Sequence, residues 1–114
     1  MPLLDTTLDI GMNAIAASIT HLGLATADPG TTGLNPSSAA RVAAGWATAA
    51  NGDTVATGKS FTGGAASGPC THVTFWSAAT GGTFRGSQAL TGDQTFNAAG
   101  QYTINSVALN SAAS

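Results

Sequence analysis

The stretch Thr71-His72-Val73-Thr74-Phe75-Trp76 is the clearest strand signal in the chain, and the fold class follows from it. β-Branched and aromatic residues fill it, and such side chains pack well on a pleated sheet. Ala79-Thr80-Gly81-Gly82 then predicts a tight turn, and residues 83–87 predict a strand that returns beside the first. A unit of this kind is typical of an antiparallel sheet.

Further strands are expected on both sides of this unit. We predict them over residues 22–26, 41–47, 54–61, 94–97 and 102–109, where apolar and polar residues alternate or bulky residues gather. Asn51-Gly52 is the strongest hairpin signal, because both residues tolerate the positive φ angles of a two-residue turn. Asp28-Pro29-Gly30 predicts another turn. Short strands separated by turns predict a mainly β fold, an antiparallel β-sandwich or jelly-roll-like domain.

One helix is expected before these strands, over about residues 5–17. Asp5 or Thr6 is the candidate cap. The apolar residues that fall on one side at helical spacing are Leu8, Met12, Ile15 and Ile19. With 114 residues the chain is long enough for one domain, 1–114, in which the strands lie within about residues 19–109.

The composition is poor in charge. Only 7% of the residues are charged, against roughly 25% in an average soluble domain. An apolar fraction of 43% with a net charge of −2 argues against disorder. Exposed charge discourages association, so a surface almost free of it favours assembly with other copies or other proteins.

Three classes of partner or location are disfavoured. Three scattered cations cannot bind a phosphate backbone, which argues against nucleic acid. No stretch reaches the ~20 apolar residues of a membrane helix. The start Met1-Pro2-Leu3-Leu4-Asp5 lacks the basic region of a signal peptide, so we expect no ordinary secretion.

Residues that could carry chemistry are few. Cys70 and His72 lie two apart and could face one side of a strand, but no motif of a cysteine hydrolase surrounds them. A metal site from His21, His72, Cys70 and an aspartate is conceivable if two strands pair side by side, although no ligand spacing supports it. Phosphate-loop and paired-carboxylate motifs are absent. We therefore expect no enzyme activity, no cofactor and no metal.

An internal similarity links two parts of the chain. Residues 20–24 resemble residues 71–75 at an offset of 51, and the match continues at several positions to residues 32 and 83. Each copy is a strand followed by a turn. Chance similarity in a chain rich in Thr and Ala, and pseudo-symmetry within one sandwich, both explain it.

Three aromatic residues are candidate interface anchors: Trp46, Phe75 and Trp76. Neighbours in a strand point to opposite faces, so of Phe75 and Trp76 one enters the core. The other faces solvent, a partner or a covering element. An exposed aromatic ring of this kind is a natural anchor for a protein interface.

Two long segments carry a resemblance to a known family. Residues 20–33 with Ala40-Arg41-Val42, and residues 71–84 with their Thr-His-Val start and Ala-Ala-Thr-Gly-Gly turn, resemble small virion proteins of tailed phages. The resemblance runs from the N-terminal helix to about residue 109. Thr74 stands where the family usually has Gly, and Ser77 where it usually has Asp. The loop between residues 33 and 40 is also short.

The resemblance implies a virion structural protein. Such proteins are commonly labelled tail-fibre or minor tail proteins, and some related β modules decorate capsids. We therefore expect a non-enzymatic accessory component on the virion exterior, assembled in the host cytoplasm. Its expected partners are other capsid or tail proteins and itself as a homo-oligomer. A receptor- or carbohydrate-binding module at a fibre tip is the alternative.

Overall fold

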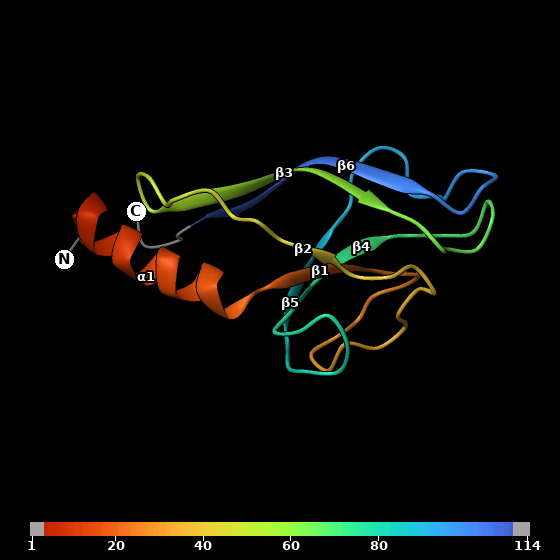
Figure 1. Ribbon diagram of the computed structural model, residues 1–114, viewed down its shortest axis with the longest axis horizontal. Coiled ribbons are helices and arrows are strands. Elements are labelled where there is room, and N and C mark those ends of the chain that lie inside the picture. The colour runs from red at the N-terminus through yellow and green to blue at the C-terminus, as the bar shows by residue number, and fades with distance from the viewer. Residues whose placement is uncertain (1–3, 111–114) are drawn as a thin grey trace.

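The computed structural model describes residues 4–110. Both ends of the expected domain 1–114 therefore lie outside the described residues. The same holds for Met1 to Leu3 of the start that is expected not to be a secretion signal. The elements are α1 (Asp5–Ser18), β1 (His21–Ala25), β2 (Val42–Ala43), β3 (Asp53–Phe61), β4 (His72–Trp76), β5 (Phe84–Ala89) and β6 (Tyr102–Asn110). The molecule is elongated, with α1 beside one end of the long β3–β6 ribbon (Figure 1).

Two antiparallel sheets make up the fold. One has the strand order β2-β1-β4-β5, and the other contains β3 and β6. The sheets face each other as in a sandwich (Figure 1). The predicted mainly β, antiparallel fold with one N-terminal helix is confirmed.

The core lies between the two sheets. Its buried side chains come from β1 (Leu22, Leu24), β4 (Val73, Phe75), β3 (Ala56, Phe61) and β6 (Ile104, Val107), with Cys70 and Phe96 from loops. β4 is buried at three successive residues because both faces of its sheet are covered. Thr74 points away from the core and is still only 4% exposed.

The Asn51-Gly52 hairpin is formed as expected. Both residues have positive φ angles, 54° and 80°, and Ala50 pairs with Asp53 across the turn. The approaching arm is held to β3 by a hydrogen bond from the Ala47 N–H to the Val55 carbonyl, at 2.9 Å.

Two predicted strands differ from the structure. The strand expected over residues 41–47 is only Val42–Ala43, because Gly45 has a φ of +61° and turns the chain away towards β3. The strand expected over residues 94–97 is only an isolated bridge between Pro69 and Thr95. There the Asp93 carboxylate accepts the Thr95 N–H and closes a turn instead.

The helix agrees in extent but differs in detail. It ends at Ser18, and its cap is Leu4, which makes no side-chain capping bond, so the predicted Asp5 or Thr6 cap is wrong. Ile15 is 49% exposed rather than buried with Leu8 and Met12.

The two similar segments become neighbouring strands, β1 and β4. They pair antiparallel, with Gly23 opposite Thr74 at the centre of the ladder. Each is followed by a turn and a returning strand, which gives the order β2-β1-β4-β5. In each unit a returning amide donates to the carbonyl before the histidine: Ala44 to Thr20 and Leu90 to Thr71. The similar segments therefore occupy equivalent positions within one sheet.

Candidate assembly surfaces

Trp76 lies half-buried on the outer face of the four-stranded sheet. The Arg41 guanidinium lies 3.7 Å from the centre of its ring, and the Phe84 ring meets it edge-on at 5.2 Å. The indole N–H donates to the Thr74 hydroxyl at 2.9 Å. The ring is thus held by a cation, a second aromatic ring and a hydrogen bond.

Arg41 joins the segment before β2 to the turn between β4 and β5. Its Nη1 donates to the carbonyls of Ala78 and Gly81, at 3.0 and 2.8 Å, which ties β2 to the turn between β4 and β5. Burial lowers the pKa of the guanidinium. Trp76 therefore serves as a platform for Arg41 within the chain.

Phe75 and Trp46 lie on the other side of the same sheet. Phe75 is 5% exposed and packs in the core, so its side chain offers almost no surface to a partner. Trp46 is half-buried, with its ring 6.2 Å from that of Phe75 and its indole N–H bonded to the Ile19 carbonyl at 2.9 Å. It borders a shallow hollow beside the C-terminal half of α1, which Asn13 and Ala17 also line.

Two polar side chains of helix α1 bond to the hairpin before β3. The Asp9 carboxylate accepts the Gly52 N–H at 2.7 Å, and the Asn13 side chain accepts the Ala49 N–H at 3.0 Å. These two residues lie one helical turn apart and satisfy amides at the tip of the hairpin before β3. Leu8, Met12 and Ala16 fill the buried side.

The outer helix face, formed by Ile10, Ala14 and Ala17, is apolar and exposed. Ile10 is 72% exposed, and both alanines are also exposed. Ile15, 49% exposed, lies at the border of the buried side that holds Leu8. An amphipathic helix normally turns its polar residues outward, whereas here Asp9 and Asn13 bond to the hairpin and Ile10 faces outward. Sequence reasoning missed this face because the hydrogen bonds of Asp9 and Asn13 to a distant hairpin leave no local signal.

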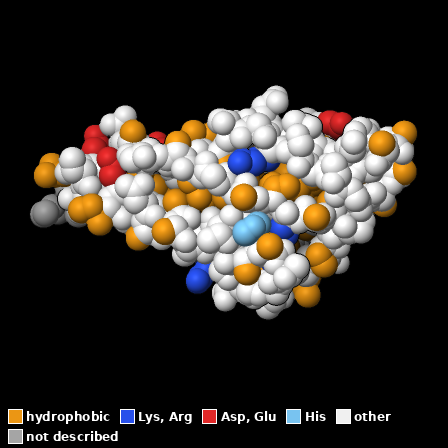
Figure 2. Space-filling view, viewed as in Figure 1, with side chains coloured by type: hydrophobic (Ala, Val, Ile, Leu, Met, Phe, Trp, Pro, Cys, Tyr) orange, Lys and Arg blue, Asp and Glu red, His pale blue; other side chains and the backbone are white. Residues whose placement is uncertain are grey.

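Charge is sparse over the surface. In the view of Figure 2, acidic side chains lie at the helix end and at the upper edge of the opposite end, and basic ones lie near the middle, with wide uncharged areas between them. Among the described residues, no helix is long and apolar enough to cross a membrane.

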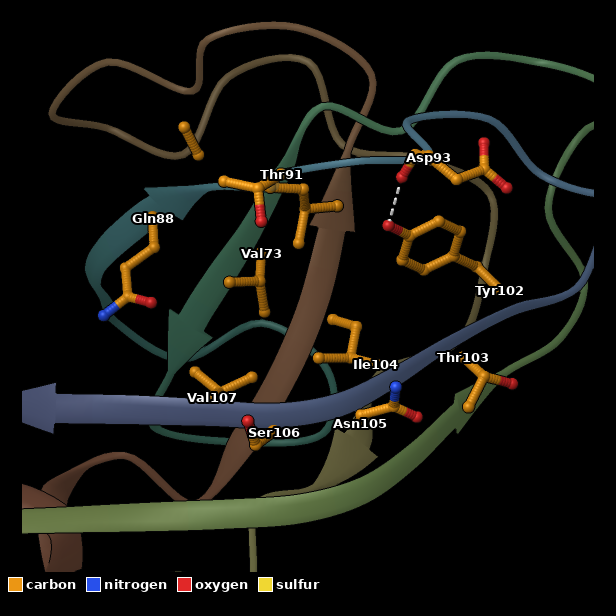
Figure 3. A pocket seen from close by; sticks show the side chains of 12 residues that line it. Val73, Gln88, Thr91, Asp93, Tyr102, Thr103, Ile104, Asn105, Ser106 and Val107 are labelled. Carbon is orange, nitrogen blue, oxygen red and sulfur yellow. Dashed lines mark hydrogen bonds between the residues drawn. The ribbon is translucent and has the colours of Figure 1, made fainter.

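A cleft of about 500 Å³ opens between β5 and β6 (Figure 3). It is lined by Val73, by residues 88–91 and Asp93, and by residues 102–107. The Tyr102 hydroxyl donates to the Asp93 carbonyl at its rim. Burial raises the pKa of the Tyr102 phenol, and the nearby Cys70 and Asp93 raise it further.

The histidines lie at opposite ends of the β1–β4 ladder. Antiparallel pairing sets His21 beside Trp76 and His72 beside Ala25. Each imidazole instead shares a hydrogen bond with the hydroxyl of the preceding threonine, at 2.9 Å for His21 and 2.8 Å for His72. Within residues 4–110 no group of three or more His, Cys, Asp or Glu side chains is placed to hold a metal ion.

Cys70 is expected to be an unreactive thiol. It is fully buried, and this burial, with a smaller contribution from Asp93, raises its pKa to about 11 from an ordinary 9.0. We predict that iodoacetamide at about pH 8 labels the folded chain at least about tenfold more slowly than the urea-unfolded chain, by mass spectrometry. Equal rates would contradict this placement.

The same shift sets a pH dependence of stability. The protonated Cys70 thiol favours the folded state below pH 9.0, and this contribution is lost as the pH rises towards 11. Urea midpoints of the wild type and of Cys70→Ser should therefore converge over that range.

Comparison with known proteins agrees with the resemblance seen in the sequence. Residues 3–112 match the family model described as Podophage GP4 fiber I protein gp80, which is nearly the whole chain. A search among curated proteins finds no match. The chain is a small phage tail-fibre-like protein and belongs to the family of the podophage GP4 fiber I protein gp80.

Proposed function

We propose that this protein is a non-enzymatic accessory component on the exterior of the phage tail fibre, and that it works through protein–protein assembly. Membership of a phage fibre family supports a structural role in the virion and contact with other virion components. The low content of charged residues, 7%, supports assembly because docking then removes few charges from water.

The outer helix face carries this proposal. A folded chain gains nothing from exposing Ile10 at 72% on a helix whose Asp9 and Asn13 side chains bond inward to the hairpin. Exposed apolar areas of this kind mark interaction sites. Trp46 and the hollow beside α1 continue the same surface, since Ala17 belongs to both. Trp46 is thus the proposed anchor.

The proposed occupant is an apolar, uncharged surface of another fibre protein. The two acidic residues of α1 are Asp5 and Asp9, and Asp9 is already bonded to the hairpin. The outer helix face therefore offers no charge for a charged partner to pair with. Assembly would take place in the host cytoplasm together with the other virion proteins.

The geometry gives less support to the alternatives. An activated thiol needs a lowered pKa, whereas that of Cys70 is raised. A carbohydrate site needs an aromatic ring with an open face, and Arg41 lies over the Trp76 ring. Neither an enzyme nor a glycan-binding module is therefore proposed.

Substitution of Ile10 by Glu tests the proposal. The change leaves the fold intact because the side chain is exposed and Glu is a better helix former than Ile. In the interface it removes about 2 kcal/mol of apolar burial and adds a charge, which weakens docking more than tenfold. We expect virions carrying Ile10→Glu to lose the protein, as measured by immunoblot of purified particles.

Ala98→Glu is the matched control. It adds the same charge at an exposed turn beyond the other end of the β3–β6 ribbon (Figure 1) and should leave incorporation unchanged. If Ile10→Glu is incorporated as well as the wild type, the outer helix face is not the docking surface.

A further inference from the structure

The two sheets have four edge strands, and three of them carry features that prevent pairing with another chain. β2 is only two residues long. β5 contains Arg85 and pairs with β4 through a register shift. β3 contains Lys59 and a Gly58 with a φ of +63°, and the arm before it covers Val55. Short length, charge and irregularity are the usual means by which proteins block strand edges.

β6 carries none of these features. Its nine residues, Tyr102 to Asn110, include no charged residue, no proline and no glycine, and its pairing with β3 shows no register shift. Thr103, Asn105 and Ser106 are exposed, uncharged and polar. Within residues 4–110, β6 pairs with β3 alone. Its ladder with β3 is interrupted only at Asn105, which lies opposite Gly58. It is therefore a long edge that carries no charge, proline or glycine.

The hydrogen-bonding groups of this edge point into the cleft beside β5. The Ala108 carbonyl turns away from β3, since it accepts the Gln88 side-chain amide at 2.6 Å. Backbone direction alternates along a strand, so Ser106, two residues earlier, presents its N–H and carbonyl on the same side. Gln88 thus occupies one end of the edge, and residues 102–106 remain open to the cleft (Figure 3).

The cleft leaves space beside the β6 edge and places little charge there. Its volume is about 500 Å³, and Asp93 is the charged residue in its lining. The Asp93 carboxylate already accepts the N–H and the hydroxyl of Thr95, at 3.0 and 2.8 Å. The surface thus offers uncharged polar side chains and the backbone donors and acceptors of the β6 edge, and the complement of the latter is another extended strand.

We propose that β6 pairs with β6 of a second copy of this chain. The two strands run antiparallel about a two-fold axis over residues 102–106 and join the two-stranded sheets into one sheet of order β3-β6-β6-β3. An antiparallel pair of identical edges is self-complementary, because each copy supplies the same donors and acceptors. Thr and Ser side chains pair favourably across such strands, and β6 brings no like charges together.

Proline at position 106 tests this pairing. Ser106 is exposed, and its N–H points away from β3, so Ser106→Pro removes no bond of the β3–β6 ladder. We expect sedimentation equilibrium to show a dimer for the full wild-type chain. For Ser106→Pro we expect a dissociation constant raised at least about tenfold.

Thr57→Pro is the matched control. Thr57 is the ladder partner of Ser106 and is also exposed. By the same alternation from Val55, it turns its N–H away from β6. It should keep the dimer. Ser106→Lys adds an edge charge without restricting the backbone, and should also weaken the dimer if the proline variant fails to fold.

Two results would overturn the pairing: a wild-type chain that is monomeric at every concentration, or a dimer that survives both Ser106→Lys and a folded Ser106→Pro. The pairing does not rest on the proposed function, because the outer helix face is remote from residues 102–106 along the ribbon (Figure 1). Loss of virion incorporation and loss of the dimer are read in separate experiments, so each proposal can fail alone.

Discussion

Replacing Phe61 with alanine is expected to remove about 3–5 kcal/mol from the free energy of unfolding. The Phe61 side chain is 0% exposed and is the largest fully buried one among the described residues. It closes the core where β3 ends, opposite Tyr102 of β6, and packs in the cluster that joins both sheets. The total free energy of unfolding of a domain of this size is roughly 5–15 kcal/mol, so the variant should be close to unfolding.

Urea denaturation followed by tryptophan fluorescence measures this loss. Phe61→Leu keeps most of the volume and should cost under about 1.5 kcal/mol. Thr57→Ala, on the exposed side of the same strand, should stay within about 0.5 kcal/mol of the wild type. A Phe61→Ala variant as stable as Phe61→Leu would show that the two sheets do not share the core described.

Replacing Gly100 with alanine is the second large effect, at about 3 kcal/mol or more. Gly100 is buried with a φ of +73°, and a Cβ there would collide with the Gly64 carbonyl oxygen. The contact is between backbones, because the Gly64 N–H donates to the Gly100 carbonyl at 2.9 Å. Relief of the collision therefore requires the two loops to separate.

Gly92→Ala separates this collision from the backbone conformation itself. Gly92 has nearly the same φ, +76°, and a Cβ there meets nothing within 4 Å. Gly92→Ala should lower the free energy of unfolding by only about 1 kcal/mol, the ordinary penalty for an alanine in the left-handed conformation. Equal losses of stability in the two variants, in parallel thermal or urea melts, would contradict the close approach of Gly64 and Gly100.

Local signals in the sequence predicted the elements whose conformation is set by neighbouring residues. Asn51-Gly52 fixes its hairpin through two positive φ angles, and residues 71–76 form a strand because β-branched and aromatic residues dominate them. The strand expected over residues 41–47 was cut short by Gly45, whose positive φ depends on where the chain must turn towards β3. That requirement lies outside the local sequence.

The assembly surfaces could be predicted only in part. The opposite orientation of Phe75 and Trp76 follows from strand geometry alone. That Arg41 lies on the Trp76 ring does not, since the two meet through the pairing of β2 with β1 and of β1 with β4. In the same way, the open edge of β6 becomes visible only once the strand order is known.

Membership of a phage fibre family and the derived surfaces point to the same kind of role. The outer helix face and the β6 edge lie in different parts of the molecule, and both lack charge. In the proposed arrangement β6 joins two copies and the helix attaches them to another fibre protein.

The copy number of the chain in purified virions tests the central proposal most directly. Quantitative mass spectrometry against the major capsid protein should give a ratio far below one, as expected for a component of the tail. A ratio near that of the capsid protein would mean that the chain decorates the capsid, and would contradict its assignment to the fibre.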